Sequence, residues 1–294
     1  MMLPSAVGAR VALVPDWHAL MEPMASLGRM QVWVGNPAAS LVRSVIWDEV
    51  VVQHSHIDFV GEGVHARLDL EQCGGVFAGE CAGPSSTPLV LSVIDHVGAS
   101  AMEFRFPARS RQGFETLVRA YRVHDRPSGG RRAPIPCVAR PNDDIDVAAL
   151  RQQWDQLGRC RSMHALLDEF GVTFGQCCRL AGGSRVRRLS ADMAHARLLA
   201  AEEQRIPSII RVHSRAATAA HIGRICATRS MGSQLHLYAC CGFGASLSLS
   251  QLRTGWDISR PGVTAASRSL EFVDDDDGRL LTVAFPGDAF LDYL

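Results

Sequence analysis

The sequence predicts an α+β protein made of two structurally repeated halves. Three observations lead to this prediction. Residues 50–63 and 88–106, and again 234–253 and 268–285, are rich in β-branched residues or alternate between apolar and polar residues, as half-buried strands do. Each half also begins with a helix-like segment around a tryptophan, and a stretch rich in proline and glycine separates the halves. We therefore expect helices first and an antiparallel sheet second in each half.

Two tryptophan-containing segments are expected to form amphipathic helices. In "DWHALMEPMASLG" the apolar face contains Trp17 and Leu20, and in "DVAALRQQWDQLG" it contains Trp154 and Leu157. The first half should have a further helix after its sheet, in residues 111–123, because four apolar residues of that segment recur at helical spacing. Helices and strands thus occur in both halves.

The boundary between the halves is expected in residues 124–144, "HDRPSGGRRAPIPCVARPNDD". Prolines and glycines alternate there with arginines, and no helical or strand periodicity is present, as is typical of a linker. The chain should divide near residue 135. We take residues 1–130 as the first repeat and residues 131–294 as the second.

Composition narrows the classes of function. The 294 residues carry no net charge, which argues against a general nucleic-acid binder. All 30 basic residues are arginine, so Schiff-base chemistry and a P-loop lysine are excluded. No apolar run has the length of a signal peptide or a membrane span, so we expect a cytoplasmic protein without membrane insertion. The nine cysteines then indicate reduced thiols.

A pair of histidines could contribute to a metal site. His54 and His56 are two residues apart on an expected strand, so their rings should share a face with Asp58. No third ligand is evident, and a solvated sheet face explains the same pattern. Farther along, Arg253 and Arg260 flank Trp256 at a strand end, where they could clamp a carboxylate or phosphate or simply be solvated.

Other motifs suggest no chemistry. The run "VDDDDGRL" lacks the ligand spacing of a calcium-binding loop, and Asp and Gly there favour a hairpin turn. The chain has no dinucleotide-binding glycine motif, no nucleophile elbow and no zinc-protease motif.

The segment from 158 to 172, "GRCRSMHALLDEFGV", predicts a short helix over residues 163–170. Ser162 is suited to the N-cap and Gly171 to the position after the helix. Met163, Leu167 and Phe170 should form the buried stripe, and His164 should point away from it. In the first turn the helix dipole favours a neutral imidazole, whose lone pair could bind a metal such as haem iron. An exposed surface histidine is the alternative.

Several segments of the chain resemble one known family. "LRQQWDQLGRCRSMHALLDEFGVTFGQCCRLAGG", "EEQRIPSIIRVHSRAATAAHIGRI", "GWDISRPG" and "RSLEFVDDDDGRLLTVAF" have the order and approximate spacing found in the HemS/ChuS/PhuS-type haem-utilisation proteins, or hemin-degrading factors. In the first half, "DWHALMEPMASLGRMQVWVGNP" and "GFETLVRAYRV" are similar to that family's first repeat. The resemblance extends over nearly the whole chain from about residue 10.

The resemblance implies a cytoplasmic bacterial protein in which each half is a large twisted antiparallel sheet with helices. One b-type haem would lie in the cleft between the halves, and the family delivers or degrades haem after its import. The axial ligand would be a histidine at the start of the helix that ends in "FGV". Arg67 in "HARLDL" would be the distal arginine, and Arg260 in "SRP" would contact a propionate.

At two places the sequence differs from the family pattern. Arg161 occupies the position of the axial histidine, and His164 follows one helical turn later, where it could reach the same cleft. We therefore count both residues among the candidate haem contacts. Near the C-terminus, Val283, Phe285 and Asp288 replace the usual Gln, aromatic residue and Arg.

Three hypotheses follow from these observations. The leading one is a haem-binding protein for haem trafficking and iron utilisation, with a haem importer or haem oxygenase as partner. If the protein is an enzyme, its reaction would be oxidative haem degradation. The alternative is a divergent member that has lost haem and acts as a protein-interaction or regulatory module. The third is a metal-dependent enzyme that uses His54 and His56.

Overall fold

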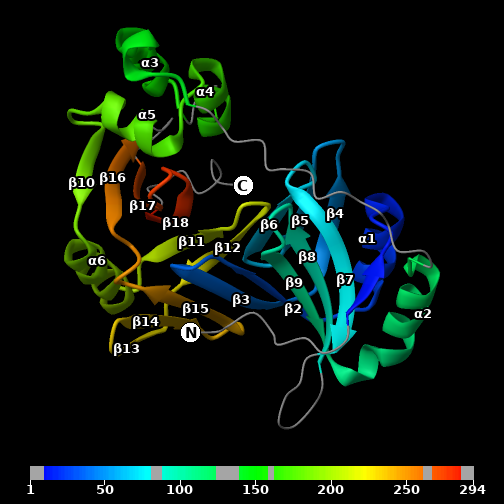
Figure 1. Cartoon of the computed structure of the whole chain (residues 1–294). Helices are drawn as coiled ribbons and strands as arrows, with labels where there is room; N and C mark the ends of the chain where they lie inside the picture. Colours follow the sequence, from blue (N-terminus) through cyan, green and yellow to red (C-terminus); the bar gives the residue numbers. More distant parts are fainter. Residues whose placement is uncertain (1–9, 81–87, 124–138, 158–161, 261–266, 286–294) are drawn as a thin grey trace. The chain divides into compact units, whose positions relative to one another are not determined.

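The computed structural model describes residues 10–80, 88–123, 139–157, 162–260 and 267–285. The chain divides into two compact units, and the unit boundary in the linker falls between Pro134 and Ile135. Unit 1 consists of Met1–Pro134 with two later segments, Val212–His221 and Tyr238–Ser246. Unit 2 consists of Ile135–Arg211, Ile222–Leu237 and Leu247–Leu294. Each unit combines strands with helices (Figure 1).

Within its described residues, the first half of the sequence forms two α-helices and nine strands. The helices are α1 (Trp17–Ser26) and α2 (Arg111–Tyr121), with a 3-10 turn, η1, at Ala108–Ser110. The strands are β1 (Val11–Leu13), β2 (Met30–Gly35), β3 (Ala39–Val45), β4 (Trp47–Val52), β5 (His56–Gly61), β6 (Val64–Asp69), β7 (Cys73–Glu80), β8 (Leu89–Asp95) and β9 (Ser100–Phe106).

The second half forms four α-helices and nine strands within its described residues. The helices are α3 (Val147–Trp154), α4 (Met163–Phe170), α5 (Phe174–Ala181) and α6 (Ala191–Glu203), after a 3-10 turn, η2, at Asn142–Asp144. The strands are β10 (Val186–Leu189), β11 (Pro207–His213), β12 (Ala217–Arg224), β13 (Ala227–Met231), β14 (Gln234–Ala239), β15 (Phe243–Ser248), β16 (Thr254–Arg260), β17 (Ser267–Val273) and β18 (Arg279–Phe285).

The strands form two sheets with the same internal order. One runs β1-β7-β8-β9-β2-β3-β15-β14-β13 and the other β10-β16-β17-β18-β11-β12-β6-β5-β4. Every strand pair with an assigned register is antiparallel. The matching order confirms the predicted α+β fold of two repeated halves. In each sheet, six strands from one half are followed by three from the other, a partition that strand periodicity does not encode.

The helices of the first half form where the apolar spacing predicts them. Helix α1 begins after Asp16, whose carboxylate accepts a hydrogen bond from the Ala19 N–H at 3.2 Å. It buries Leu20, Met21 and Met24, whereas Trp17 is only half-buried. Helix α2 buries Phe114 and Leu117. These helical faces supply part of the core of unit 1.

In unit 2, helices α3, α4 and α5 lie close together (Figure 1). Their apolar side chains form one hydrophobic core. Trp154 is fully buried at its centre, and Val186, Ile258 and Val273 bring one face of the sheet against the helices. Packing of this kind holds short helices that would be marginal alone. No helix in the described part of the chain is long and apolar enough to cross a membrane.

The aspartate run after β17 forms a hairpin turn, as predicted. The Asp274 carboxylate accepts hydrogen bonds from the Asp276 and Gly278 N–H groups at 3.0 and 2.7 Å. Asp277 adopts a positive φ of 63°, which Asp tolerates better than most residues. Its carboxylate accepts two hydrogen bonds from the Arg179 guanidinium, so the turn is attached to α5.

Unit 1 buries a histidine, His221, with only 1% of its surface exposed. Its ring stacks on Phe243 at a centroid distance of 4.0 Å. Burial, together with the positive charge of Arg43, lowers the pKa of His221 to about 4, although a contact with the Gly63 backbone opposes the shift. The folded protein therefore favours the neutral ring. The stability this provides is complete above the unfolded-state pKa, near 6.5, and is lost as the pH falls toward 4.

We predict that His221 makes the protein less stable at pH 5 than at pH 7, by about 2 kcal/mol from this residue alone. The His221→Leu variant should lose this part of the pH dependence. Urea unfolding at the two pH values measures it, with the exposed His18→Gln as control. An unchanged pH dependence in His221→Leu would contradict the assignment.

Candidate functional site

Helix α4 carries the principal candidate ligand. It begins after Ser162, whose hydroxyl accepts a hydrogen bond from the Ala165 N–H at 3.2 Å, and ends at Gly171, whose φ is 63°. Both ends agree with the sequence prediction. Leu166 is the fully buried residue of the helix, while the predicted stripe of Met163, Leu167 and Phe170 is partly buried against the same core. The predicted residues do face the core, but Leu166, the most deeply buried residue of the helix, was not among them.

His164 points away from this core, as predicted. Its side chain is 84% exposed, and Nε2 lies 3.4 Å from a carboxylate oxygen of Asp168, one turn later. An exposed pair of this type contributes little to stability, so the ring can turn at small cost. The imidazole is therefore accessible as a ligand. Arg161, the neighbouring candidate, lies outside the described residues.

The second candidate, Arg67, lies on β6 in unit 1. Its Nε and Nη2 donate hydrogen bonds to the two carboxylate oxygens of Asp58 at 2.7 and 2.9 Å. The register explains this fork, because Asp58 on β5 is directly opposite Arg67. The Arg67 side chain is 49% exposed. Three of its five N–H donors take no part in the fork and are available to a ligand.

Two histidines complete this group, which we call the Asp58 cluster: His56, Asp58, His65 and Arg67. Nε2 of His56 and Nε2 of His65 each lie 3.2 Å from an Asp58 carboxylate oxygen. His65 was missed in the sequence, although it alternates with Arg67 along "VHARLD" as residues on one strand face do. The placement of His54 was wrong, because it lies in the turn before β5. His54 and Ser55 belong to the turn in which the chain reverses direction between β4 and β5.

The charge of the cluster is balanced around one carboxylate. Burial by itself raises the pKa of Asp58, but the hydrogen bond and charge of Arg67, with His65 and His56 nearby, outweigh it and hold this pKa below its ordinary value. Asp58 therefore stays ionised and orients Arg67. In the described residues no group of three or more His, Cys, Asp or Glu side chains is arranged to hold a metal ion.

The remaining candidates lie near β16. Arg260 is the last residue of this strand and pairs with Ser267, but its side chain is outside the described part of the structure. Arg253 is exposed just before the strand. Trp256, which lies between them in the sequence, is half-buried and packs against the core of unit 2. The tryptophan thus has a structural role. Asp288 lies outside the described residues.

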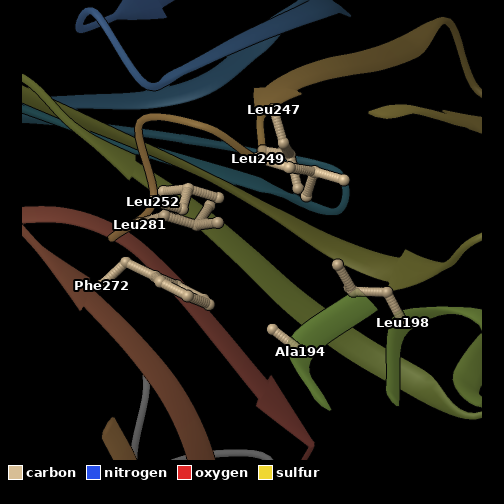
Figure 2. A pocket seen from close by; sticks show the side chains of 7 residues that line it. All are labelled: Ala194, Leu198, Leu247, Leu249, Leu252, Phe272 and Leu281. Carbon is tan, nitrogen blue, oxygen red and sulfur yellow. The ribbon is translucent and has the colours of Figure 1, made fainter. Parts of the chain in front are cut away.

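A pocket in unit 2 lies between α6 and the sheet, and Figure 2 shows its lining. The residues that line it are Ala194, Leu198, Leu247, Leu249, Leu252, Phe272 and Leu281. All are apolar, and the free volume of about 10 Å³ is that of one water-sized sphere. The pocket is a gap in the packing and is too small for an organic ligand.

Comparison with known proteins identifies the fold. No protein-family model matches the chain, and no curated protein matches its sequence. Among solved structures, holo-PhuS, a heme-binding protein from Pseudomonas aeruginosa, is 24% identical and superposes with a TM-score of 0.84 over 95% of this chain and 82% of that one. Apo-PhuS is 25% identical, with a TM-score of 0.83 and the same coverage.

ChuS, an E. coli heme oxygenase, is 14% identical and superposes with a TM-score of 0.83 over 95% of this chain and 83% of its own. Both PhuS and ChuS therefore share the architecture described above along nearly the full chain. The chain has the PhuS/ChuS fold, which confirms its resemblance to the HemS/ChuS/PhuS-type proteins.

Proposed function

We propose that this protein binds haem as cargo for haem trafficking and iron utilisation, with His164 as the axial ligand. The observation that carries the proposal is an accessible imidazole on a capped helix of a chain with the fold of PhuS, a heme-binding protein. Imidazole nitrogen is a common axial ligand of haem iron. A bound haem would supply a redox-active iron.

The surroundings of His164 suit this role. The helix is fixed at both ends by its caps and on one side by Leu166, so the position of the His164 backbone is defined. The Asp168 carboxylate can accept a hydrogen bond from the ring nitrogen that does not bind iron, which orients the ring and strengthens it as a donor. The ring must turn for this, because Nε2 now faces Asp168.

Arg67 is the proposed distal contact, and Asp58 is the residue that positions it. The fork between them fixes the guanidinium plane while leaving donors for a haem-bound group or a propionate. Arg161 and Arg260 remain proposed contacts by sequence position. We also propose that the protein is cytoplasmic and that its partner is a haem importer or haem oxygenase. The division into repeats 1–130 and 131–294 likewise remains a proposal.

We predict that hemin added to the wild-type protein gives a sharpened Soret band that saturates at one equivalent. The His164→Ala variant should bind hemin at least tenfold more weakly, a loss of about 1.4 kcal/mol or more. His18→Ala is a matched control, because His18 is also exposed in the first turn of a helix, α1.

Two outcomes would change the proposal. Equal spectra and affinities for His164→Ala and His18→Ala would remove His164 as the ligand. Because His213 and His221 are buried, the half-buried His195 of α6 would be tested next. A wild-type spectrum identical to that of free hemin would reject haem binding. The protein-interaction or regulatory module would then be the better hypothesis.

A separate prediction concerns the Asp58 cluster. Arg67→Gln should weaken hemin binding about tenfold, because a hydrogen bond from a charged group contributes about 1.5 kcal/mol or more. Arg29→Gln, which removes an exposed arginine elsewhere in unit 1, should leave the affinity unchanged. Titrations at constant ionic strength compare the two variants. Equal affinities would exclude Arg67 from the site.

A further inference from the structure

Three arginines of unit 2 converge on one buried carboxylate. The Nη2 atoms of Arg187, Arg197 and Arg268 lie 3.1, 2.9 and 2.9 Å from the same oxygen of Asp257. Because all three share this oxygen, any two of the Nη2 atoms lie within about 6 Å of each other. We call these four residues the Asp257 cluster. It includes none of the candidate haem contacts, although Arg260 ends the strand that carries Asp257.

The sheet and one helix bring the cluster together. Arg187 on β10 is directly opposite Asp257 on β16, and Arg268 comes from the neighbouring strand β17. Arg197 reaches the same point from α6, the helix that packs against this face of the sheet through Ala194 and Leu198. Helices α3 to α5 pack on the other face. The cluster is therefore separated by the sheet from the helix that carries His164.

The charges of the cluster do not balance. In the described part of the chain Asp257 is the one carboxylate that these three guanidinium groups contact, which leaves two positive charges in excess. Two other arginines of unit 2 are each paired with a single carboxylate: Arg185 forms a two-bond fork with Asp155, and Arg179 forms one with Asp277. Like charges held this close repel one another, and a bound anion would relieve the repulsion.

The unused donors face solvent. The side chains of Arg187 and Arg268 are 62% and 54% exposed, whereas that of Asp257 is 2% exposed. The buried carboxylate thus orients the guanidinium groups from the protein side, and most of the N–H donors of Arg187 and Arg268 remain accessible to solvent. Ser259 lies on the same face, opposite Arg268, and is half-buried. Oriented guanidinium groups with a nearby hydroxyl are the donor set that tetrahedral oxyanions accept.

We propose that the Asp257 cluster is a binding site for a phosphate-class oxyanion, with Arg187 and Arg268 as its principal contacts and Arg197 as a third cationic contact. Asp257 acts as a positioning residue that holds the three arginines together. The site is independent of haem, so its test uses haem-free protein.

Calorimetric titration of inorganic phosphate into the full chain, at ionic strength held constant with sodium chloride, tests the proposal. The wild type should show saturable binding at one site, and the Arg187→Gln/Arg268→Gln variant should bind at least tenfold more weakly. Arg188→Gln is the matched control. It removes the adjacent exposed arginine of β10, which lies opposite Trp256 on the other face of the sheet.

Circular dichroism establishes that each variant is folded. If the double variant is not, the single change Arg187→Gln takes its place, because that side chain is the most exposed of the three. Phosphate should also raise the melting temperature of the wild type more than that of the cluster variant, because its general stabilising effect is common to both proteins. Absence of saturable binding in the wild type, or equal binding by the cluster variant and Arg188→Gln, would overturn the proposal.

Discussion

The ladder formed by β5, β6 and β12 fixes both the core and the polar cluster of unit 1. Its register places Asp58 opposite Arg67, and Arg67 opposite Thr218. On the other face of the same strands, Phe59, Ala66 and Ala219 are fully buried. A slip of one residue would exchange the two faces and put charged side chains into the core. The burial of the apolar face therefore holds the Asp58 cluster in place.

A buried carboxylate organises arginine in both units, with different results. Asp58 receives one guanidinium in a two-bond fork and two imidazoles, so the arginine is oriented and its charge is matched. Asp257 receives three guanidinium groups on a single oxygen, so positive charge remains in excess. Since the chain contains no lysine, every such contact uses the planar guanidinium, which stays charged and bonds directionally. One arginine on the carboxylate gives a pair of matched charge, as at Asp58. Three arginines on one carboxylate give a surface with excess positive charge, as at Asp257.

The features that were predicted correctly are those that depend on near neighbours in the sequence. Ser162 and Gly171 fix the ends of α4 through contacts within a few residues, and the aspartate turn after β17 is equally local. The exposure of His164 followed from helical spacing alone. His54 was misplaced because strand alternation does not show where a strand begins, and His65 was missed because its partner, Asp58, is on the preceding strand.

The sequence by itself determined the α+β class, the repetition of the halves and the positions of α1 to α4, since hydrophobic period and capping are local properties. Only the tertiary structure decided which sheet each strand joins, because a strand has the same period in either sheet. It alone also brought Arg187 and Arg197 to Asp257, from 70 and 60 residues away along the chain. Contacts of such separation depend on strand pairing and helix packing, which no short stretch of sequence specifies.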